Sequence, residues 1–185
     1  MTQNADLKEV LKVVKMTVDE AKAKRKRRLP KSQKLWIEHL GEFSEGKRTG
    51  WGTCVFKTSD KYCGFFQNDK MHGRGTYWFA NVTNSVFYVG EFSDNNFQGL
   101  GKMVFSDGTT YYGSFVNNSM SSKRAVMHFA NGEKYKGEIQ MSKRNGQGEY
   151  SQVVKATEGE HQDQTVSLVY EGEFRDDMRH GQGIV

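Results

Sequence analysis

Residues 88–111 read YVGEFSDNNFQGLGKMVFSDGTTY, and the spacing of their glycines decides the fold. Gly90 is followed by glycines nine and eleven positions later, at Gly99 and Gly101. Repetition of one spacing along a chain is typical of repeat architectures, so we predict an array of similar units. The glycines that share this spacing, and to which we assign a structural role, are Gly41, Gly50, Gly52, Gly64, Gly73, Gly75, Gly90, Gly99, Gly101, Gly137, Gly146, Gly148, Gly172, Gly181 and Gly183.

The leading glycine of each unit sets the boundaries of the array, which we place at residues 35–185. With Gly113 included, six units follow one another with a basic length near 23 residues. Their predicted limits lie near 39–61, 62–87, 88–110, 111–134, 135–169 and 170–185.

Aromatic residues flank the leading glycines at a spacing typical of β-strands. In the third unit Tyr88 lies two positions before Gly90 and Phe92 two positions after it. Side chains two apart share one face of a strand, so each unit is predicted to be two strands with one apolar face. Polar stretches such as QNDKM and SDNNF are predicted to be hairpin loops, and SDGT and ANGE tight turns between units. The predicted fold is an all-β antiparallel meander of about twelve strands.

The stretches YVGEFSDNNFQGLGKMVFSDGTTY and YEGEFRDDMRHGQG resemble the MORN repeat, the membrane occupation and recognition nexus module. The resemblance covers about residues 39–185. It implies an elongated, single-layer antiparallel sheet that is often bent into a groove and serves as a scaffold. Similar arrays occur in cilia, flagella and the cortical cytoskeleton, so the resemblance also implies a cytoskeletal or axonemal setting.

Two parts of the array depart from the repeat. The fourth unit lacks its second glycine pair, and Lys123 and Ala125 take those places if the extra residue lies in the hairpin loop. This unit is interpreted either as ordinary sequence drift or as a bend or partner contact. Between the fifth and sixth units, surplus residues that include KATEGEHQDQ predict an elongated, mobile hairpin.

The sequence ends at Val185, midway through the second strand of the sixth unit. An array that ends there leaves an unpaired strand edge. We expect either that the chain is a fragment of a longer array or that a partner completes this edge, which includes pairing into a homodimer.

Residues 1–34 follow a different pattern. An apolar stripe at three- and four-residue spacing predicts an amphipathic helix, which Pro30 ends. The stripe has two possible destinations, the aromatic face of its own sheet or a helix on another protein. Its members are Leu7, Val10, Leu11, Val14, Val18 and Ala21.

Positive charge is concentrated in this N-terminal segment. Of the net charge of +5, residues 1–34 contribute +7 and the other 151 residues −2. The basic run can be a solvated helix end or a contact to an anionic membrane or acidic protein, and a nucleic-acid partner is the least favoured reading. The run comprises Lys22, Lys24, Arg25, Lys26, Arg27 and Arg28.

The sequence offers no pattern for catalysis, a metal or a cofactor. His72 and His180 precede repeat glycines and are predicted to be structural. Cys54 and Cys63 have opposite strand parity, so we expect no disulfide between them. No apolar signal segment or run of about 18 apolar residues is present, so we expect a cytoplasmic protein of the cytoskeleton or cilium.

The function predicted from the sequence is a non-catalytic scaffold that binds a helical or extended partner segment along its aromatic face. The alternative is a membrane-recruiting regulatory module, or the accessory region of a larger enzyme. Trp78, on the opposite face from Tyr77, is expected to be an exposed hot spot. The predicted partner-binding residues are Tyr62, Phe66, Tyr77, Trp78, Phe79, Tyr88, Phe92, Met103, Phe105, Tyr111, Phe115 and Tyr135.

Overall fold

A computed structural model describes residues 36–155 and 165–185 of the chain. The chain divides into two compact units. Unit 1 ends at Ser106, and unit 2 begins at Asp107. The predicted helix within 1–34, the basic run and most of the segment KATEGEHQDQ lie outside the described residues.

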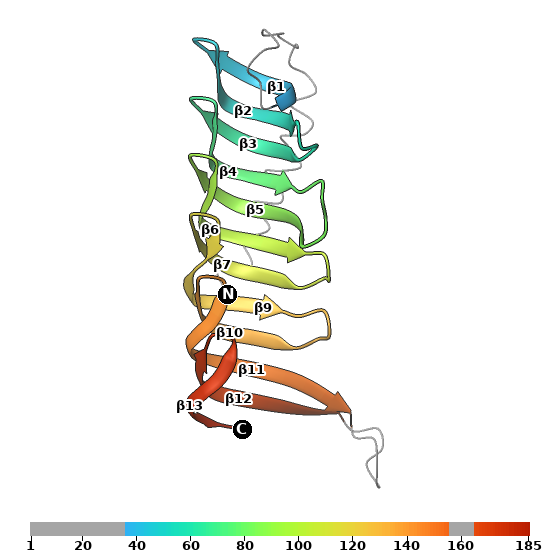
Figure 1. Cartoon of the computed structure of the whole chain (residues 1–185), viewed down its shortest axis with the longest axis vertical. Helices are drawn as coiled ribbons and strands as arrows, with labels where there is room; N and C mark the ends of the chain where they lie inside the picture. Colours follow the sequence, from blue (N-terminus) through green and yellow to red (C-terminus); the bar gives the residue numbers. More distant parts are fainter. Residues whose placement is uncertain (1–35, 156–164) are drawn as a thin grey trace. The chain divides into compact units, whose positions relative to one another are not determined.

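Unit 1 is a single antiparallel layer in which each strand pairs with the next one along the chain (Figure 1). Two-residue side-chain periodicity and the turn residues between the strands produce this meander, as the sequence predicted. Its strands are β1 (Trp36–Ser44), β2 (Lys47–Phe56), β3 (Lys61–Gln67), β4 (Lys70–Trp78), β5 (Ser85–Ser93) and β6 (Asn96–Phe105).

Unit 2 has the same architecture, and no helix occurs among the described residues of either unit. The prediction of an all-β, single-layer antiparallel fold is therefore confirmed. The strands are β7 (Thr110–Val116), β8 (Ser119–Met120), β9 (Ser122–His128), β10 (Lys134–Gln140), β11 (Lys143–Lys155), β12 (Thr165–Arg175) and β13 (Met178–Ile184), with β8 pairing only with β7. The long β11 and β12 form the elongated hairpin that the surplus residues predicted.

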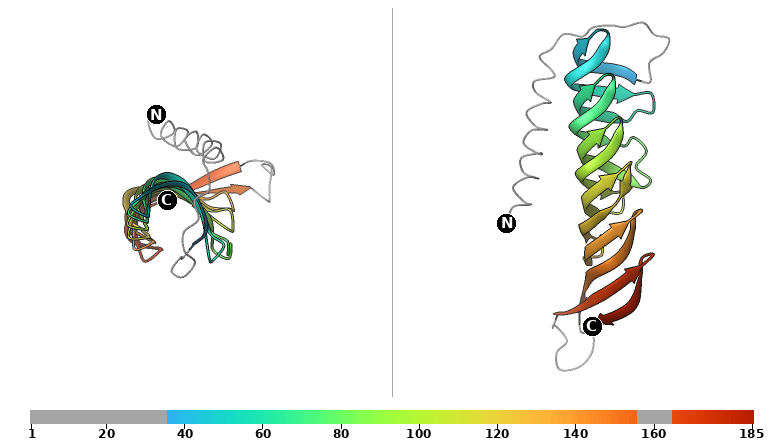
Figure 2. Two further views of the ribbon diagram at one scale, coloured as in Figure 1. Left: turned by 90° about the horizontal axis from the view of Figure 1, so that it is seen from above. Right: turned by 90° about the vertical axis from the view of Figure 1, so that its left-hand side faces the viewer.

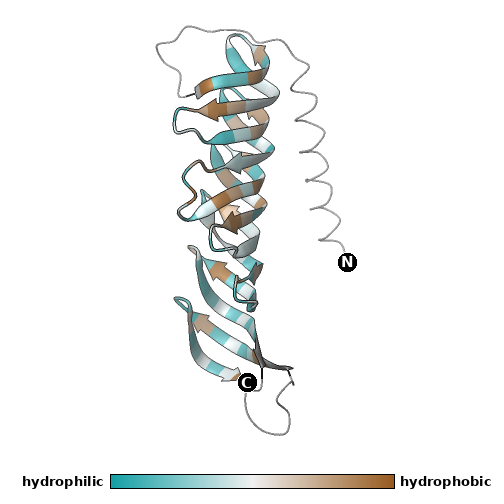
Figure 3. Cartoon of the chain, turned by 90° about the vertical axis from the view of Figure 1, so that its right-hand side faces the viewer, coloured by the Kyte–Doolittle hydropathy of each residue, from teal (hydrophilic) through white to brown (hydrophobic). Residues whose placement is uncertain are grey.

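The hairpin turns are shorter than the sequence suggested. β5 and β6 are joined by Asp94 and Asn95 alone, with φ of 50° and 72°. Two positive φ values are typical of a tight type I′ turn, which fits the twist of the flanking strands. The stretch SDNNF was therefore wrongly assigned to a loop, because its last two residues already belong to β6. Apolar residues lie within the strands, whereas the turns are largely hydrophilic (Figure 3).

Successive hairpin turns are joined to one another by what we call the turn clasp. The Met71 backbone N–H donates to Asn95 Oδ1 over 2.8 Å, and the Asn95 backbone N–H donates back to the Met71 carbonyl over 3.0 Å. The same reciprocal pair connects Arg48 with Asp69, Met120 with Ser142 and Arg144 with Asp177. The polar turn residues thus connect each of these hairpins to the following one.

The repeated glycines have two different tasks. In the β5–β6 hairpin Gly90 pairs with Gly101, but Glu91 pairs with Gln98, so Gly99 and Leu100 form a β-bulge. Gly99 has a φ of +62°, a backbone conformation that other residues rarely adopt. The first glycine of the later pair has a positive φ in every complete repeat, at Gly50, Gly73, Gly99, Gly146 and Gly181.

The other repeated glycines make room for an aromatic ring. Gly90 and Gly101 lie opposite each other, and the Tyr88 ring lies over both. A Cβ atom on Gly101 would be 2.5 Å from Tyr88 Cε2, closer than atoms can pack. The same arrangement holds for Tyr62 over Gly64 and Gly75.

The fourth hairpin differs because its extra residue enters the bulge. Its turn has the same length as the others, since Val116 pairs with Ser119, so the extra residue does not lie in the hairpin loop. Tyr111 pairs with Met127, and continuing this register places Ala125 opposite Gly113. Ala125 therefore takes the place of the second glycine although the extra residue lies in the bulge, and the wider bulge splits the strand into β8 and β9.

Candidate partner-binding face

One face of each unit carries a ladder of buried aromatic rings. Each ladder tyrosine donates its hydroxyl hydrogen bond to the carbonyl three residues later, as Tyr88 does to Glu91 over 2.9 Å. Its ring also meets a phenylalanine edge-on, as Tyr88 meets Phe92 at 5.2 Å between centroids. The ladder tyrosines are Tyr62, Tyr88, Tyr111, Tyr135 and Tyr170.

Rings from non-adjacent strands meet across the glycines. Tyr62 of β3 and Phe92 of β5 have centroids 4.9 Å apart, although β4 lies between their strands. Strands two apart are separated by about 9.6 Å, so the rings converge on this side of the layer. The strands of unit 1 are curved when seen end-on (Figure 2). We therefore assign the aromatic face to the concave side, where converging side chains can bury a ring completely.

The structure divides the predicted partner-binding residues into a buried and a half-buried set. Tyr62, with an exposed fraction of 0%, represents the buried set, which supports the surface instead of forming it. Its members are Tyr62, Phe66, Tyr88, Phe92, Met103, Tyr111, Phe115 and Tyr135. Tyr77, Trp78, Phe79 and Phe105 are half-buried and keep surface for contact. Trp78 lies on the opposite face from Tyr77, but it is not the exposed residue that the sequence suggested.

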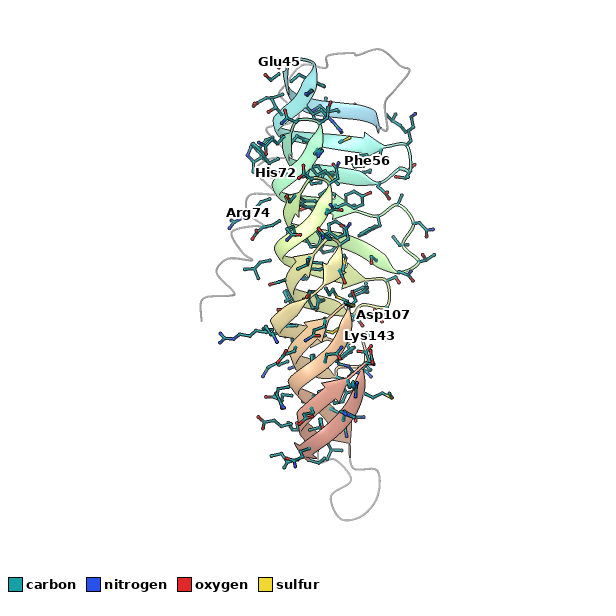
Figure 4. The ribbon with its side chains drawn as sticks, turned by 60° about the vertical axis from the view of Figure 1, so that its left-hand side comes forward. Glu45, Phe56, His72, Arg74, Asp107 and Lys143 are labelled. Atoms are coloured by element: carbon teal, nitrogen blue, oxygen red, sulfur yellow. The ribbon has the colours of Figure 1, made fainter. Side chains whose placement is uncertain are left out.

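Four half-buried rings of unit 1 form a continuous surface, which we call the aromatic patch and which consists of Phe56, Tyr77, Phe79 and Phe97. Tyr77 is 5.8 Å from Phe56, 5.0 Å from Phe79 and 6.0 Å from Phe97 between ring centroids. Phe97 stacks at 4.2 Å on the buried Tyr88, so the patch rests on the ladder. Phe56 lies at the far end of the strands from His72 and Arg74 (Figure 4).

Sequence reasoning missed Phe56 and Phe97 as surface residues. Phe97 was assigned to a polar hairpin loop, but its equivalents Met71 and Met120 are also apolar residues in polar stretches. That recurrence was the signal in the sequence that could have placed Phe97 on the aromatic face.

Asp60 fixes the orientation of Tyr77 in the patch. The Tyr77 hydroxyl donates to Asp60 Oδ2 over 2.7 Å, and the Ala80 backbone N–H donates to Asp60 Oδ1 over 2.7 Å. Burial opposes ionisation of Asp60, but these bonds and one from Thr58 outweigh it and hold the pKa of the carboxyl below its usual value. Burial, followed by the bond to Asp60, raises the pKa of Tyr77, which therefore stays protonated and keeps its donor.

In several hairpins an arginine occupies the position that Met71 and Phe97 hold in theirs. The Arg48 guanidinium lies 4.8 Å from the centre of the Phe66 ring, and that of Arg179 lies 4.7 Å from the centre of the Tyr170 ring. Arg144 is within 5.5 Å of the Phe174 ring centre. These positions correspond to Met71 and Phe97, so the aromatic face changes from cationic to apolar within unit 1.

His39 occupies the ladder position in the first hairpin. Its ring meets Phe43 and Phe66 edge-on, at 5.1 and 5.0 Å. Burial, followed by the positive charge of Arg48, lowers the pKa of His39 from 6.5 to about 4. The imidazole is therefore neutral in the folded protein at neutral pH.

This low pKa predicts a pH-dependent stability. Below pH 6.5 the unfolded state binds a proton that the folded state takes up only near pH 4, so acid favours unfolding in this window. We expect a loss of about 1 kcal/mol per pH unit within the window. Urea unfolding of the protein and of His39→Tyr between pH 7 and 4 measures this loss. A His39→Tyr variant that shows the same pH slope as the original protein would contradict the assignment.

The described residues hold no group of three or more histidine, cysteine, aspartate or glutamate side chains that could bind a metal. Cys54 pairs with Tyr62 on the aromatic face, while Cys63 pairs with Thr53 on the other face. Both cysteines are free, in agreement with the predicted absence of a disulfide. Burial raises the pKa of the Cys54 thiol to about 11, with Arg48 opposing the shift. Residues 36–155 and 165–185 contain no helix with the length and hydrophobicity of a membrane span.

Comparison with known proteins gives a family and a weak structural likeness. No curated protein matches the sequence. Among solved structures, the "SAS-4 (dCPAP) TCP domain in complex with a Proline Rich Motif of Ana2 (dSTIL)" of Drosophila melanogaster matches at 11% sequence identity and a TM-score of 0.34. The match covers 78% of this chain and 97% of that one.

The family model for the MORN repeat matches residues 39–61, 62–81, 88–110, 135–152 and 170–184. The fourth hairpin, which has the wider bulge, is not among the matched segments. The matched segments make up more than half of the chain and contain every ladder tyrosine except Tyr111. The chain therefore belongs to the MORN-repeat family.

Proposed function

We propose that this protein is a non-catalytic scaffold whose aromatic patch binds an apolar helical or extended segment of a partner protein. MORN repeats support a protein-interaction or membrane-association module. The observation that supports the protein-binding role is the aromatic patch, in which Tyr77 meets the other three rings and all four remain half-buried.

The patch has the properties of a binding surface because its rings are held in place before a partner arrives. Phe97 is stacked on Tyr88, and Tyr77 is bonded to Asp60. Rigid aromatic side chains lose little conformational entropy on binding and contribute much of the energy at protein interfaces. An apolar segment that covers these rings would remove their remaining surface from water.

The setting that we propose is a cytoskeletal or ciliary assembly, such as a radial-spoke-like complex, in the cytoplasm. This setting rests on the occurrence of similar arrays in such assemblies. The partner proteins of such an assembly would occupy the concave face of unit 1.

Photo-crosslinking tests the location of the binding surface. Benzoylphenylalanine at Phe79 is expected to crosslink the partner segment in cell extract, because Phe79 lies in the patch. The matched control carries the probe at Leu100, an apolar residue that is 63% exposed in the β6 bulge outside the patch. Crosslinks from Leu100 to the same polypeptide, with none from Phe79, would place the binding surface elsewhere.

Charge substitution in the patch tests its energetic role. We expect Phe56→Lys combined with Phe79→Lys to weaken partner binding by at least about tenfold, because two ammonium groups would enter an apolar interface. Leu100→Lys is the control, and thermal unfolding shows whether each variant is folded. Undiminished binding by a folded double variant would refute the proposed surface.

Membrane association remains the second role that the family supports. The six basic residues predicted to contact an anionic membrane, from Lys22 to Arg28, lie outside the described residues. The proposed membrane contact therefore rests on the sequence. Sedimentation with vesicles containing phosphatidylserine, before and after replacing these six residues by Gln, distinguishes the two roles. Loss of vesicle binding together with unchanged crosslinking from Phe79 would assign the roles to separate parts of the chain.

A further inference from the structure

The outer face of unit 1, opposite the aromatic ladder, carries a row of residues that are small or apolar from β1 to β5 and that ends at Lys102 of β6. Strand pairing aligns them side by side across all six strands. We call this set the outer row, and it consists of Leu40, Thr53, Cys63, Thr76, Val89 and Lys102.

The outer row lies between larger side chains. Phe65 and Trp51 flank it on one side, and Trp78 and Phe87 on the other, as the alternation of side chains along each strand requires. Cys63, Thr76 and Val89 have exposed fractions of only 4%, 2% and 4%. A row of short side chains between larger ones forms a channel that crosses the strands. At the β1–β4 end, a hollow is lined by Leu40, Thr53, Val55, Cys63 and Trp78, among others.

The corresponding row of unit 2 shows that an apolar outer face is not a requirement of the fold. Its aligned members include Lys136, Glu149 and Glu171. Lys136 and Glu149 form an ion pair with 3.3 Å between Nζ and Oε1. The row of unit 2 thus has charges on β10, β11 and β12 between the uncharged Tyr112, Val126 and Ile184, whereas the row of unit 1 is uncharged from β1 to β5. The run of uncharged residues from β1 to β5 is therefore suited to an apolar segment.

The N-terminal segment of the same chain has the length that this row requires. The six strands of unit 1 span about 24 Å, from five gaps of about 4.8 Å each. A helix over residues 7–21, which contain the apolar stripe, would be about 22 Å long at 1.5 Å per residue. Residues 22–35 then connect this helix to β1, which begins at Trp36.

Charge fixes the direction of such a helix. The orientation that brings opposite charges together has its carboxyl end near β1. In this orientation the basic run approaches Glu38 of β1, while Asp6 and Glu9 approach Lys102 of β6. Both ends therefore meet residues of opposite charge, and the reversed orientation would bring like charges together.

We propose that residues 7–21 form a helix whose apolar stripe packs along the outer row of unit 1. This site is neither of the two destinations that the sequence suggested, which were the aromatic face of the same sheet and a helix on another protein. It lies on the same sheet, but on the face opposite the aromatic one. The helix would leave the aromatic patch accessible and hold the basic run beside β1.

Thiol labelling tests this contact, because the two cysteines lie on opposite faces. Leu11→Asp combined with Val14→Asp places two charges on the apolar stripe and should release the helix. We expect alkylation of Cys63 by N-ethylmaleimide, followed by mass spectrometry, to become at least about tenfold faster, while that of Cys54 stays unchanged. An equal rise at both cysteines would indicate general unfolding of the variant and count against the proposal.

The matched control is Ala5→Asp combined with Met16→Asp. A helical projection places both residues opposite the stripe, so the same two charges should leave Cys63 protected. If Cys63 reacts equally fast in the original protein, in the stripe variant and in this control, the helix does not cover the outer row. If the control exposes Cys63 as much as the stripe variant does, the contact is not made by the stripe.

Discussion

Replacing Gly101 by alanine is expected to lower the free energy of unfolding by about 3 kcal/mol, a large effect for one methyl group. The added Cβ would lie 2.5 Å from Cε2 of Tyr88. That ring is fully buried and is held between Phe92 and Phe97, so it cannot move aside without breaking these contacts. Urea unfolding followed by tryptophan fluorescence measures the loss.

Gly46→Ala provides the control for this substitution. Gly46 has a φ of +77° in a hairpin turn, and no atom lies within 4 Å of the position of its added Cβ. Alanine there should cost only the backbone strain, about 1–2 kcal/mol. Equal losses for the two variants would show that the close fit beneath Tyr88 does not determine stability.

Ala125 shows how the fold accommodates a methyl group at the equivalent position. It is buried at 1% exposure in the register position of the second repeat glycine. In this hairpin the bulge is wider and the strand is split into β8 and β9. We infer that a Gly101→Ala protein that retains its fold would adopt a similar distortion locally.

Tyr88→Ala is expected to have the largest effect, a loss of about 4 kcal/mol, because it removes a fully buried ring and leaves a cavity. Tyr88→Phe keeps the ring and removes only the hydroxyl, which donates to the Glu91 carbonyl over 2.9 Å and to the Gln98 carbonyl over 3.4 Å, so it should cost about 1 kcal/mol. Denaturant unfolding of both variants compares the two contributions. A phenylalanine variant as unstable as the alanine one would show that the hydroxyl, and not the packing of the ring, holds this hairpin.

The strands and their faces could be predicted from sequence because alternation along a strand is a local property. Tyr88, Gly90 and Phe92 share a face in the structure, as their spacing required. Cys54 and Cys63 likewise lie on opposite faces. The family resemblance added the single-layer arrangement, which periodicity alone does not establish.

The burial of individual side chains and the positions of bulges and turns were harder to predict, because they depend on neighbouring strands. Alternation placed Tyr62 on the aromatic face, but its complete burial depends on the rings of Phe66 and Phe92. The extra residue of the fourth hairpin could enter either the turn or the bulge, and sequence counting does not distinguish them. Phe97 was missed for the same reason, since the position of a turn within a polar stretch was not known.

The turn clasp has a mechanical consequence for the array. A tension applied along the direction in which the hairpins follow one another loads the strand pairing and the clasp at the same time, for example at Met71 and Asn95. We therefore expect the hairpins to detach one at a time under load. Each detached repeat of 23 residues would release about 80 Å of chain, giving a stepwise extension in an optical trap.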